Sequence, residues 1–592
     1  MNGSIVSART SRHEIRLEGD FQSFTAELTS ETLGEGLDRV ILRLRADQPV
    51  RPGPMRLAFR HPSVNVFARW HPAVLHARHL PPDWGDGFTA ELTRNAPVMC
   101  LYAADGTNQL TVACSDPMNP LMLRFGVQEE SAEVRCRVHL FERVHPPITR
   151  YELQLHVDTR PVFYAAALDH VQSWWATRPG CQPRSVPEVA RLPMYSTWYS
   201  FHQNIDTAAV LAQCRLAREL GCDALIVDDG WQTNDNRRGY AYAGDWEAQR
   251  IGDMKRFVAD VHDVGMKFLL WYAVPFVGIH SRAFRRFEDK LLTRLESLQA
   301  GVLDPRFPDV REHLIGTLER ALRDWDLDGF KLDFVDEFAV RNGVRAPEPR
   351  PGMDFVSVSE AAYRLLEDTF DRLHQIKPDI MVEFRQEYIG PVMRRFGNMF
   401  RAGDCPNDAL TNRLRTLDIR LLCGRTACHS DMLMWHPDDR VEAAALQVLA
   451  TLFSVPQVSV LLDRLAPAHL KMLRFWLDFW RANRDVLLDG ELRPLHPETL
   501  YPVVVASTPH KRLIALYQEM VAPAGSNVPR ELLVVNATFA SRAVIDIPEA
   551  IGKRTLEIRD CQGNVVASER RAFTAGVHVL SVPPAGLVRI GA

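Results

Sequence analysis

The first 160 residues alternate between hydrophobic and polar positions in short runs that turn residues interrupt. Residues 40–44 and 152–157 are two such runs. A period of two places alternate side chains on one face, and short strands with frequent turns are typical of packed antiparallel sheets. We therefore expect a β-sandwich, followed by a helix over residues 163–176 and a Pro/Gly/Arg-rich linker at residues 178–184.

From about residue 190 the pattern changes to short apolar runs separated by amphipathic helical stretches. Parallel strands joined by helices produce this alternation. The candidate strands are residues 193–199, 224–227, 267–271, 300–303, 329–332, 380–384, 399–402, 427–432 and 458–462, with helices such as 207–220, 254–264 and 310–325 between them. Because a (β/α)₈ barrel needs eight strands, one of these nine is an extra strand or a false prediction.

Strand-like alternation returns after a predicted helix at residues 466–483. It is clearest at residues 513–517, 532–535, 543–547 and 587–590. A chain of 592 residues is too long for one hydrophobic core. We predict a multidomain α/β and β protein with three units: an N-terminal β-sandwich plus linker helix (1–185), a (β/α)₈ TIM barrel (186–488) and a smaller C-terminal β-sandwich (489–592).

Composition narrows the possible partners. A formal net charge of -4 provides no field that would collect phosphates, so we expect neither nucleic acid nor membrane as a partner. No apolar run is long enough to span a bilayer, and the first ten residues lack the apolar core of a secretory signal, which predicts a cytoplasmic protein. The ten cysteines include no CxxC pair, so we expect reduced thiols and no metal site. A homo-oligomer is possible.

Three acidic motifs follow predicted barrel strands. They are Asp228-Asp229-Gly230-Trp231, Lys331-Leu332-Asp333 and Arg401-Ala402-Gly403-Asp404. A TIM barrel builds its active site at the carboxyl ends of its strands. Retaining glycosidases use two carboxyl groups about 5–5.5 Å apart, one ionised and one protonated. Further carboxylates that bind hydroxyl groups, with an aromatic face, would complete a sugar pocket.

Each motif also has a structural interpretation. Lys331 and Asp333 lie two apart on one strand and face the same way, so the cation would keep Asp333 ionised, yet they could equally form a structural ion pair. Asp228 and Asp229 could cap a helix or form a turn, although adjacent carboxylates repel each other unless something binds them. Trp231 could pack in the core or contact a ligand.

Six motifs in chain order resemble family 36 α-galactosidases and their relatives over about 200 residues of the barrel. They are Trp198-Tyr199-Ser200-Phe201, Leu225-Ile226-Val227-Asp228-Asp229-Gly230-Trp231-Gln232, Gly244-Asp245-Trp246, Leu270-Trp271, Gly329-Phe330-Lys331-Leu332-Asp333 and Arg401-Ala402-Gly403-Asp404. The resemblance implies a retaining α-glycosidase that needs no cofactor and acts on a carbohydrate with terminal α-linked galactose-like sugars.

The resemblance also implies roles for single residues. Asp333 would be the nucleophile and Asp404 the general acid/base, within the segment 403–408. Asp228 and Asp229 would hold the 4- and 6-hydroxyls, Lys331 the 3- or 4-hydroxyl, and Arg401 the 2-hydroxyl. The predicted substrate-binding set is Asp228, Asp229, Trp231, Lys331, Trp198, Trp271, Arg401, Glu383 and Arg385.

Two segments depart from the family pattern. The usual glycine-rich loop is replaced by Val382-Glu383-Phe384-Arg385-Gln386-Glu387-Tyr388, and the segment 271–277 after the Leu-Trp strand is also altered. Glu383 and Glu387 could accept hydrogen bonds from a different sugar or pair with Arg385. Alternatives are therefore a glycosidase for another α-sugar, a galactosyl-transferring enzyme similar to raffinose synthases, and an inactive sugar-binding relative.

A second aspartate competes for the acid/base role. Asp431 lies in the Ser-Asp of Cys428-His429-Ser430-Asp431, at the end of a later predicted strand. Chain order favours Asp404, because its motif directly follows the Glu383 strand. We expect His429 to be structural and His202 to lie at the pocket edge.

Overall fold

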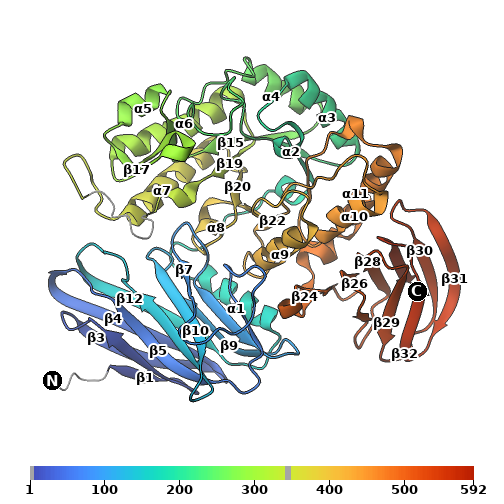
Figure 1. The fold of residues 1–592 in the computed structure, drawn as a ribbon, viewed down its shortest axis with the longest axis horizontal. Helices are drawn as coiled ribbons and strands as arrows, with labels where there is room; N and C mark the ends of the chain where they lie inside the picture. Colours follow the sequence, from blue (N-terminus) through green and yellow to red (C-terminus); the bar gives the residue numbers. More distant parts are fainter. Residues whose placement is uncertain (1–5, 340–347, 592) are drawn as a thin grey trace.

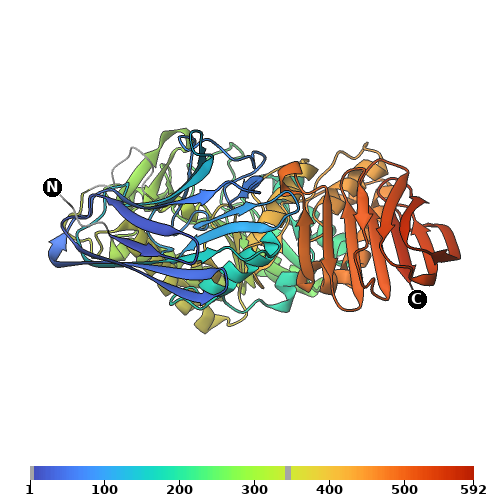
Figure 2. The same cartoon turned by 90° about the horizontal axis from the view of Figure 1, so that it is seen from below.

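The computed structural model describes residues 6–339 and 348–591. A central barrel is flanked by an N-terminal and a C-terminal β-sheet unit (Figure 1). Figure 2 shows both β-sheet units on one side of the barrel, at opposite ends of the molecule. Within the described ranges, no helix has the length and apolar character that crossing a membrane requires.

The N-terminal unit consists of two six-stranded sheets, as predicted. One has the order β1 (Ser7–Arg9), β2 (Glu14–Gly19), β5 (Met55–Pro62), β11 (Glu133–Leu140), β10 (Leu121–Gln128) and β7 (Phe88–Ala90). The other has the order β3 (Thr25–Gly34), β4 (Leu37–Val50), β12 (Ile148–Asp158), β9 (Asn108–Cys114), β8 (Val98–Tyr102) and β6 (Ala68–Trp70). Val40, Leu42 and Leu44 alternate along β4 and are all buried, so the period-two pattern correctly identified the inner face.

The central unit contains the predicted parallel barrel. Its eight strands are β13 (Met194–Ser196), β14 (Ala224–Val227), β15 (Lys267–Ala273), β19 (Gly329–Asp333), β20 (Met381–Arg385), β21 (Met399–Arg401), β22 (Ala427–His429) and β23 (Gln457–Val458). A parallel bridge joins His429 on β22 to Val455, two residues before β23, and so brings the two edge strands together.

Helices connect and surround the barrel strands. They are α2 (Trp198–Phe201), α3 (Thr207–Glu219), α4 (Met254–Asp263), α5 (Arg282–Phe287), α6 (Pro308–Trp325), α7 (Val358–Ile376), α8 (Met393–Phe396), α9 (Ala409–Arg420), α10 (Val441–Ala450) and α11 (Pro467–Asp489), and α1 (Tyr164–Ala176) precedes the barrel. Asp206, Asp253 and Asp408 cap α3, α4 and α9, each accepting a backbone N–H of the first turn.

The ninth candidate strand lies outside the barrel. Residues 300–303 form β18 (Ala300–Leu303), which pairs antiparallel with β16 (Phe276–Gly278) and β17 (Leu291–Leu295) in a small side sheet. All four residues of β18 are buried. A short apolar run is equally compatible with a barrel strand and with a buried side sheet, so the pattern alone did not separate them.

The C-terminal unit has a seven-stranded sheet packed with a three-stranded sheet. The larger sheet has the order β24 (Glu491–Leu495), β25 (Val503–Ser507), β26 (Lys511–Leu516), β28 (Glu531–Asn536), β33 (Leu587–Gly591), β30 (Gly552–Arg559) and β31 (Val565–Phe573). The smaller has β27 (Val521–Pro523), β29 (Arg542–Ile547) and β32 (Gly576–Ser581). The unit boundaries at 185 and 488 stay predictions.

A buried carboxylate joins all three units. Asp418 on α9 accepts hydrogen bonds from Trp70 Nε1 (2.8 Å), from Arg78 Nη2 (2.8 Å) and from the Tyr501 hydroxyl (2.6 Å). Trp70 and Arg78 belong to the N-terminal unit, and Tyr501 to the C-terminal one. The Arg78 and Asp418 side chains are almost fully buried, so each charge depends on the other.

We expect Asp418→Asn to destabilise the protein strongly. The amide keeps the shape but leaves the Arg78 charge buried without its counter-ion, and breaking such a pair costs about 3–5 kcal/mol. Thermal unfolding measures this change as a lower midpoint. The control Asp371→Asn removes a half-exposed partner of Arg184, which contributes about 0–1 kcal/mol. Equal midpoints for the two variants would contradict the role of Asp418.

Candidate active site

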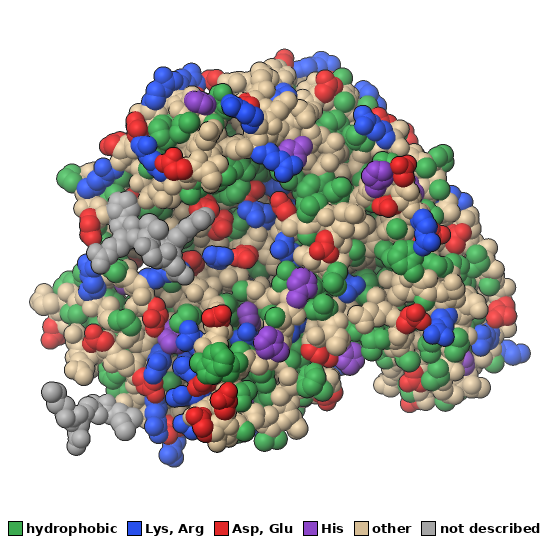
Figure 3. Space-filling view, viewed as in Figure 1, with side chains coloured by type: hydrophobic (Ala, Val, Ile, Leu, Met, Phe, Trp, Pro, Cys, Tyr) green, Lys and Arg blue, Asp and Glu red, His purple; other side chains and the backbone are tan. Residues whose placement is uncertain are grey.

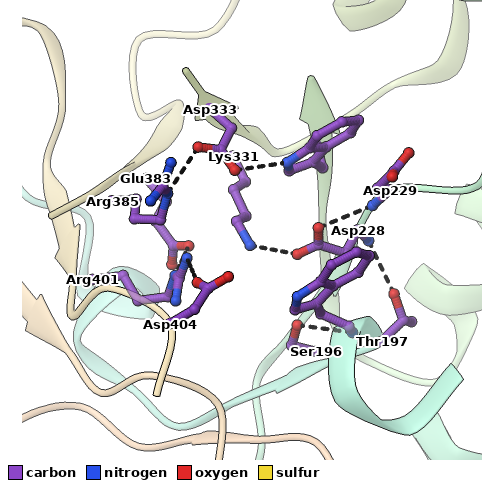
Figure 4. Close-up of polar contacts among 12 residues, drawn as sticks. Ser196, Thr197, Asp228, Asp229, Lys331, Asp333, Glu383, Arg385, Arg401 and Asp404 are labelled. Carbon is purple, nitrogen blue, oxygen red and sulfur yellow. Dashed lines mark hydrogen bonds and ion pairs between the residues drawn. The ribbon is translucent and has the colours of Figure 1, made fainter. Parts of the chain in front are cut away.

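The predicted site residues converge at the carboxyl ends of neighbouring barrel strands. Asp228 follows β14, Lys331 and Asp333 lie on β19, Glu383 and Arg385 on β20, and Arg401 on β21. Lys331 is in register with Glu383, and Arg385 with Arg401. Figure 4 shows these side chains pointing toward one another, and Figure 3 shows a hollow at the centre of the barrel with acidic and basic side chains inside it.

Four donors hydrogen-bond to Asp333, three of them to Oδ1 and one to Oδ2. Oδ1 accepts from Arg385 Nε (2.9 Å), the Tyr388 hydroxyl (2.5 Å) and the Phe334 backbone N–H (2.9 Å). Among the described residues, Oδ2 accepts only from Trp271 Nε1, at 3.2 Å. Burial opposes ionisation, but the charges of Arg385 and Lys331 and the Tyr388 hydrogen bond hold the pKa of Asp333 well below its ordinary value. Asp333 is therefore an ionised carboxylate with one lightly bonded oxygen.

Asp228 and Lys331 form a buried ion pair across the floor of the site. Lys331 Nζ lies 2.5 Å from Asp228 Oδ2, and both side chains are almost fully buried. The Thr197 hydroxyl accepts the Asp228 backbone N–H at 2.9 Å, which fixes the strand end. The pair offers a sugar both an acceptor and a donor.

Asp229 has a different environment from its neighbour. Gln203 Nε2 donates to one of its oxygens and Gln232 Nε2 to the other, both at 2.7 Å. Burial raises the pKa of Asp229 to about 6, against the lowering effect of these amides. Sequence reasoning missed Gln203 and Gln232, although Gln232 directly follows the DDGW motif. Each oxygen thus accepts one protein hydrogen bond and keeps acceptor capacity for another, so the predicted hydroxyl contact of Asp229 stays a prediction.

The three predicted tryptophans occupy different depths. Trp231 has no exposed surface; its Nε1 donates to the Trp271 carbonyl and its ring packs on Trp246 and Tyr272. This burial and packing favour the packing interpretation of Trp231, and its contact with a sugar stays a prediction. Trp271 is buried against Asp333, whereas Trp198 is partly exposed and stacks on His202 with ring centroids 3.9 Å apart.

Arg401 is the centre of a buried charge cluster. Its guanidinium lies 3.3 Å from Glu383, 2.9 Å from Asp404 and 2.6 Å from Asp431, and its side chain is 1% exposed. Glu383 is fully buried and also accepts from Gln457 Nε2, and burial raises its pKa against the charge of Arg401. Glu383 thus pairs with Arg401 inside the barrel, and its contact with substrate stays a prediction.

Asp404 and Asp431 are distinguished by exposure and bonding. Asp431 is fully buried and accepts from Arg401, the Cys405 N–H (2.6 Å) and the Tyr199 hydroxyl (2.9 Å). Asp404 is 47% exposed, with one carboxylate hydrogen bond, from Arg401. Burial raises and Arg401 lowers the pKa of Asp404, with a net lowering. Of the two, only Asp404 has a carboxylate open to a ligand.

One group of possible metal ligands lies outside the barrel. Within residues 6–339 and 348–591, one cluster could hold an ion: His156 and Asp158 on β12 with His170 on α1. Arg160 already donates to both oxygens of Asp158. His429, at the barrel, is fully buried and bonded to the Ala190 carbonyl, as its structural interpretation predicted.

Comparison with known proteins points to one family. Residues 189–383 match the Melibiase family model. Alpha-galactosidase 2 of Pediococcus pentosaceus is 25% identical over 210 residues, which is 33% of this chain and 28% of that protein. Alpha-galactosidase AgaA of Geobacillus stearothermophilus is 23% identical over 193 residues, 31% of this chain and 26% of that protein. The aligned part thus spans about a quarter of the length of these curated relatives.

The fold match extends further than the sequence match. The α-galactosidase structure from Lactobacillus brevis has a TM-score of 0.65 at 13% identity, covering 100% of this chain and 85% of that one. The G. stearothermophilus AgaA structure in complex with 1-deoxygalactonojirimycin has a TM-score of 0.63 at 15% identity, covering 99% and 85%. The chain is therefore similar to family 36 α-galactosidases, in sequence through part of its barrel and in fold over its whole length.

Proposed function

We propose that this protein is a retaining α-glycosidase that hydrolyses terminal α-linked galactose-like sugars. One observation carries the proposal: an ionised Asp333 with a lightly bonded Oδ2 shares a pocket with a half-exposed Asp404. Retaining glycosidases need such a pair of carboxyl groups, one to attack and one to transfer protons. The relatives named above as α-galactosidases support a galactosyl substrate.

The reaction would proceed by double displacement. Asp333 Oδ2 attacks the anomeric carbon as its bond to the leaving oxygen breaks, and Asp404 gives its proton to that oxygen. Asp404 then takes a proton from water, which attacks the same carbon and releases Asp333. A bound sugar removes water from the exposed side of Asp404, and this desolvation raises its pKa toward the protonated form that the first step needs.

The remaining charged groups would bind the sugar. Asp228 and Lys331 present an acceptor and a donor at the floor of the site, and Trp198 provides a partly exposed ring at its edge. AgaA has been solved with stachyose and with raffinose, which supports a galactosyl oligosaccharide as substrate here. The cytoplasmic location and a homo-oligomer stay predictions from the sequence.

Hydrolysis of p-nitrophenyl α-glycosides and of raffinose tests the two aspartates. We expect Asp333→Gly to abolish turnover of both. Asp404→Ala should lose about 10²–10⁴-fold in turnover of raffinose, because the leaving group of raffinose needs a proton. The loss of turnover should be smaller with the nitrophenyl glycoside. Asp438→Asn, at an exposed surface site, is the control and should keep full activity.

Azide separates the two roles by product stereochemistry. In Asp333→Gly, azide should replace the missing nucleophile and give a β-glycosyl azide. In Asp404→Ala, azide should react with the glycosyl-enzyme intermediate and give an α-glycosyl azide. Full activity of either variant without azide would refute the corresponding assignment.

The pH profile tests the donors around Asp333. The nucleophile must be ionised, so activity is lost as the pH falls through its pKa. Tyr388→Phe removes a hydrogen bond to the ionised form and raises that pKa, so the acidic limb of kcat/KM should move to higher pH. We expect about a 10-fold loss of kcat/KM near neutral pH. The control Tyr363→Phe removes a hydroxyl bonded to Glu367 on α7 and should leave the limb unchanged; an unshifted limb in Tyr388→Phe would contradict the argument.

A further inference from the structure

Arg385 stands between the two candidate catalytic carboxyl groups. It ends β20, whose neighbours in the barrel are β19, with Asp333, and β21, which leads to Asp404. Its Nε donates to Asp333 Oδ1 at 2.9 Å, and its guanidinium packs over the rings of Phe334 and Tyr388. Figure 4 shows the side chain directed into the group of converging residues. Its orientation is therefore set without using its terminal nitrogens.

The terminal nitrogens of Arg385 are available to a ligand. In the described part of the chain neither Nη1 nor Nη2 has a recorded partner, and the side chain is 24% exposed. Arg401 differs: its Nη1 is bonded to Asp431 and the Ala402 carbonyl, its Nη2 to Asp404, and the side chain is buried. Of these two arginines, Arg385 is the one that can donate to a bound sugar.

The reaction chemistry selects the sugar position that Arg385 can contact. Asp333 and Asp404 must lie on either side of the anomeric carbon, so a group between them reaches that carbon's neighbours, the ring oxygen and the C2 substituent. The transition state carries positive charge on the anomeric carbon and ring oxygen. A guanidinium beside the ring oxygen would oppose this charge, whereas beside C2 it can donate to a hydroxyl. Hydrogen bonds to the 2-hydroxyl strengthen in such transition states.

We propose that Arg385 binds the C2 hydroxyl of the sugar whose bond is cleaved, and so selects substrates that carry a free hydroxyl there. The inference rests on the proposed function and deepens it. It transfers to Arg385 the 2-hydroxyl contact that family resemblance implied for Arg401, whose side chain is 1% exposed and whose terminal nitrogens donate to Asp431 and Asp404. The residue lies in the segment 382–388, where the sequence departs from the family pattern.

A double-mutant cycle between enzyme and substrate tests the contact. The measured quantity is the ratio of kcat/KM for p-nitrophenyl α-galactoside to that for its 2-deoxy analogue. Hydrogen bonds to charged groups change such ratios by about 10- to 100-fold. We expect Arg385→Met to lower the ratio by about this factor. The comparison holds even though Arg385→Met slows both substrates by disturbing Asp333, because that loss cancels in the ratio.

Arg94→Met is the matched control. Arg94 lies on the loop between β7 and β8 and pairs with Glu387 at 2.8 Å, two residues from Arg385, with both side chains about half exposed. Its removal should leave the ratio at the wild-type value. Arg385→Lys keeps the charge near Asp333 but loses the planar fork, and should give an intermediate ratio.

The outcomes separate this inference from the proposed function. An unchanged ratio in Arg385→Met, with measurable hydrolysis of both substrates, would overturn the C2 contact and leave the glycosidase intact. If the wild type hydrolyses no α-glycoside, calorimetry can measure the Kd values of galactose and 2-deoxygalactose for the same variants. The ratio of these two Kd values then replaces the ratio of kcat/KM values. Failure to bind either sugar would overturn the proposed function and this inference together.

Discussion

Arg401 provides the interaction on which the candidate site depends. Three carboxylates, Glu383, Asp404 and Asp431, come from three different strand ends and share its one guanidinium. Charges removed from water are tolerated only when they are paired and hydrogen-bonded. Because Glu383 and Asp431 have no exposed surface, they depend on this cation, and the cation depends on them. The cluster links β20, β21 and the segment after β22. Asp404 is the carboxylate of this cluster that is exposed to solvent.

Aspartates have two different roles within the site, and the environment of each carboxylate decides which role it has. Asp228 and Asp229 are adjacent, yet one pairs with Lys331 and the other accepts hydrogen bonds from two glutamine amides. Asp404 and Asp431 share Arg401, yet only Asp404 is open to solvent. Donor count and exposure therefore divide the carboxylates into groups that can react and groups that hold the others in place, as environments do in other acid/base pairs.

Sequence reasoning succeeded where the information was local and failed where contacts span long separations. The period-two runs and strand–helix alternation predicted the sheets and the barrel, and the spacing of Lys331 and Asp333 predicted that both face the pocket. The hydrogen bond from Tyr388 to Asp333 spans 55 residues and that from Gln457 to Glu383 spans 74, and no local pattern marks either. For Trp231 the sequence left core packing and ligand contact open, because Trp246 and Tyr272 cover it only after folding.

The N-terminal unit supports the loop in which this chain departs from its relatives. The Asn95 backbone N–H donates to the Glu387 carbonyl at 2.7 Å. At Gly390 a Cβ atom would lie only 2.9 Å from the Asn95 carbonyl oxygen, so the close approach of the two units requires glycine there. The segment from the end of β20 to Gly390 includes Arg385 and Tyr388, the two side chains that donate to Asp333 Oδ1. The geometry of the candidate nucleophile thus depends on a unit that contributes none of the candidate catalytic carboxylates.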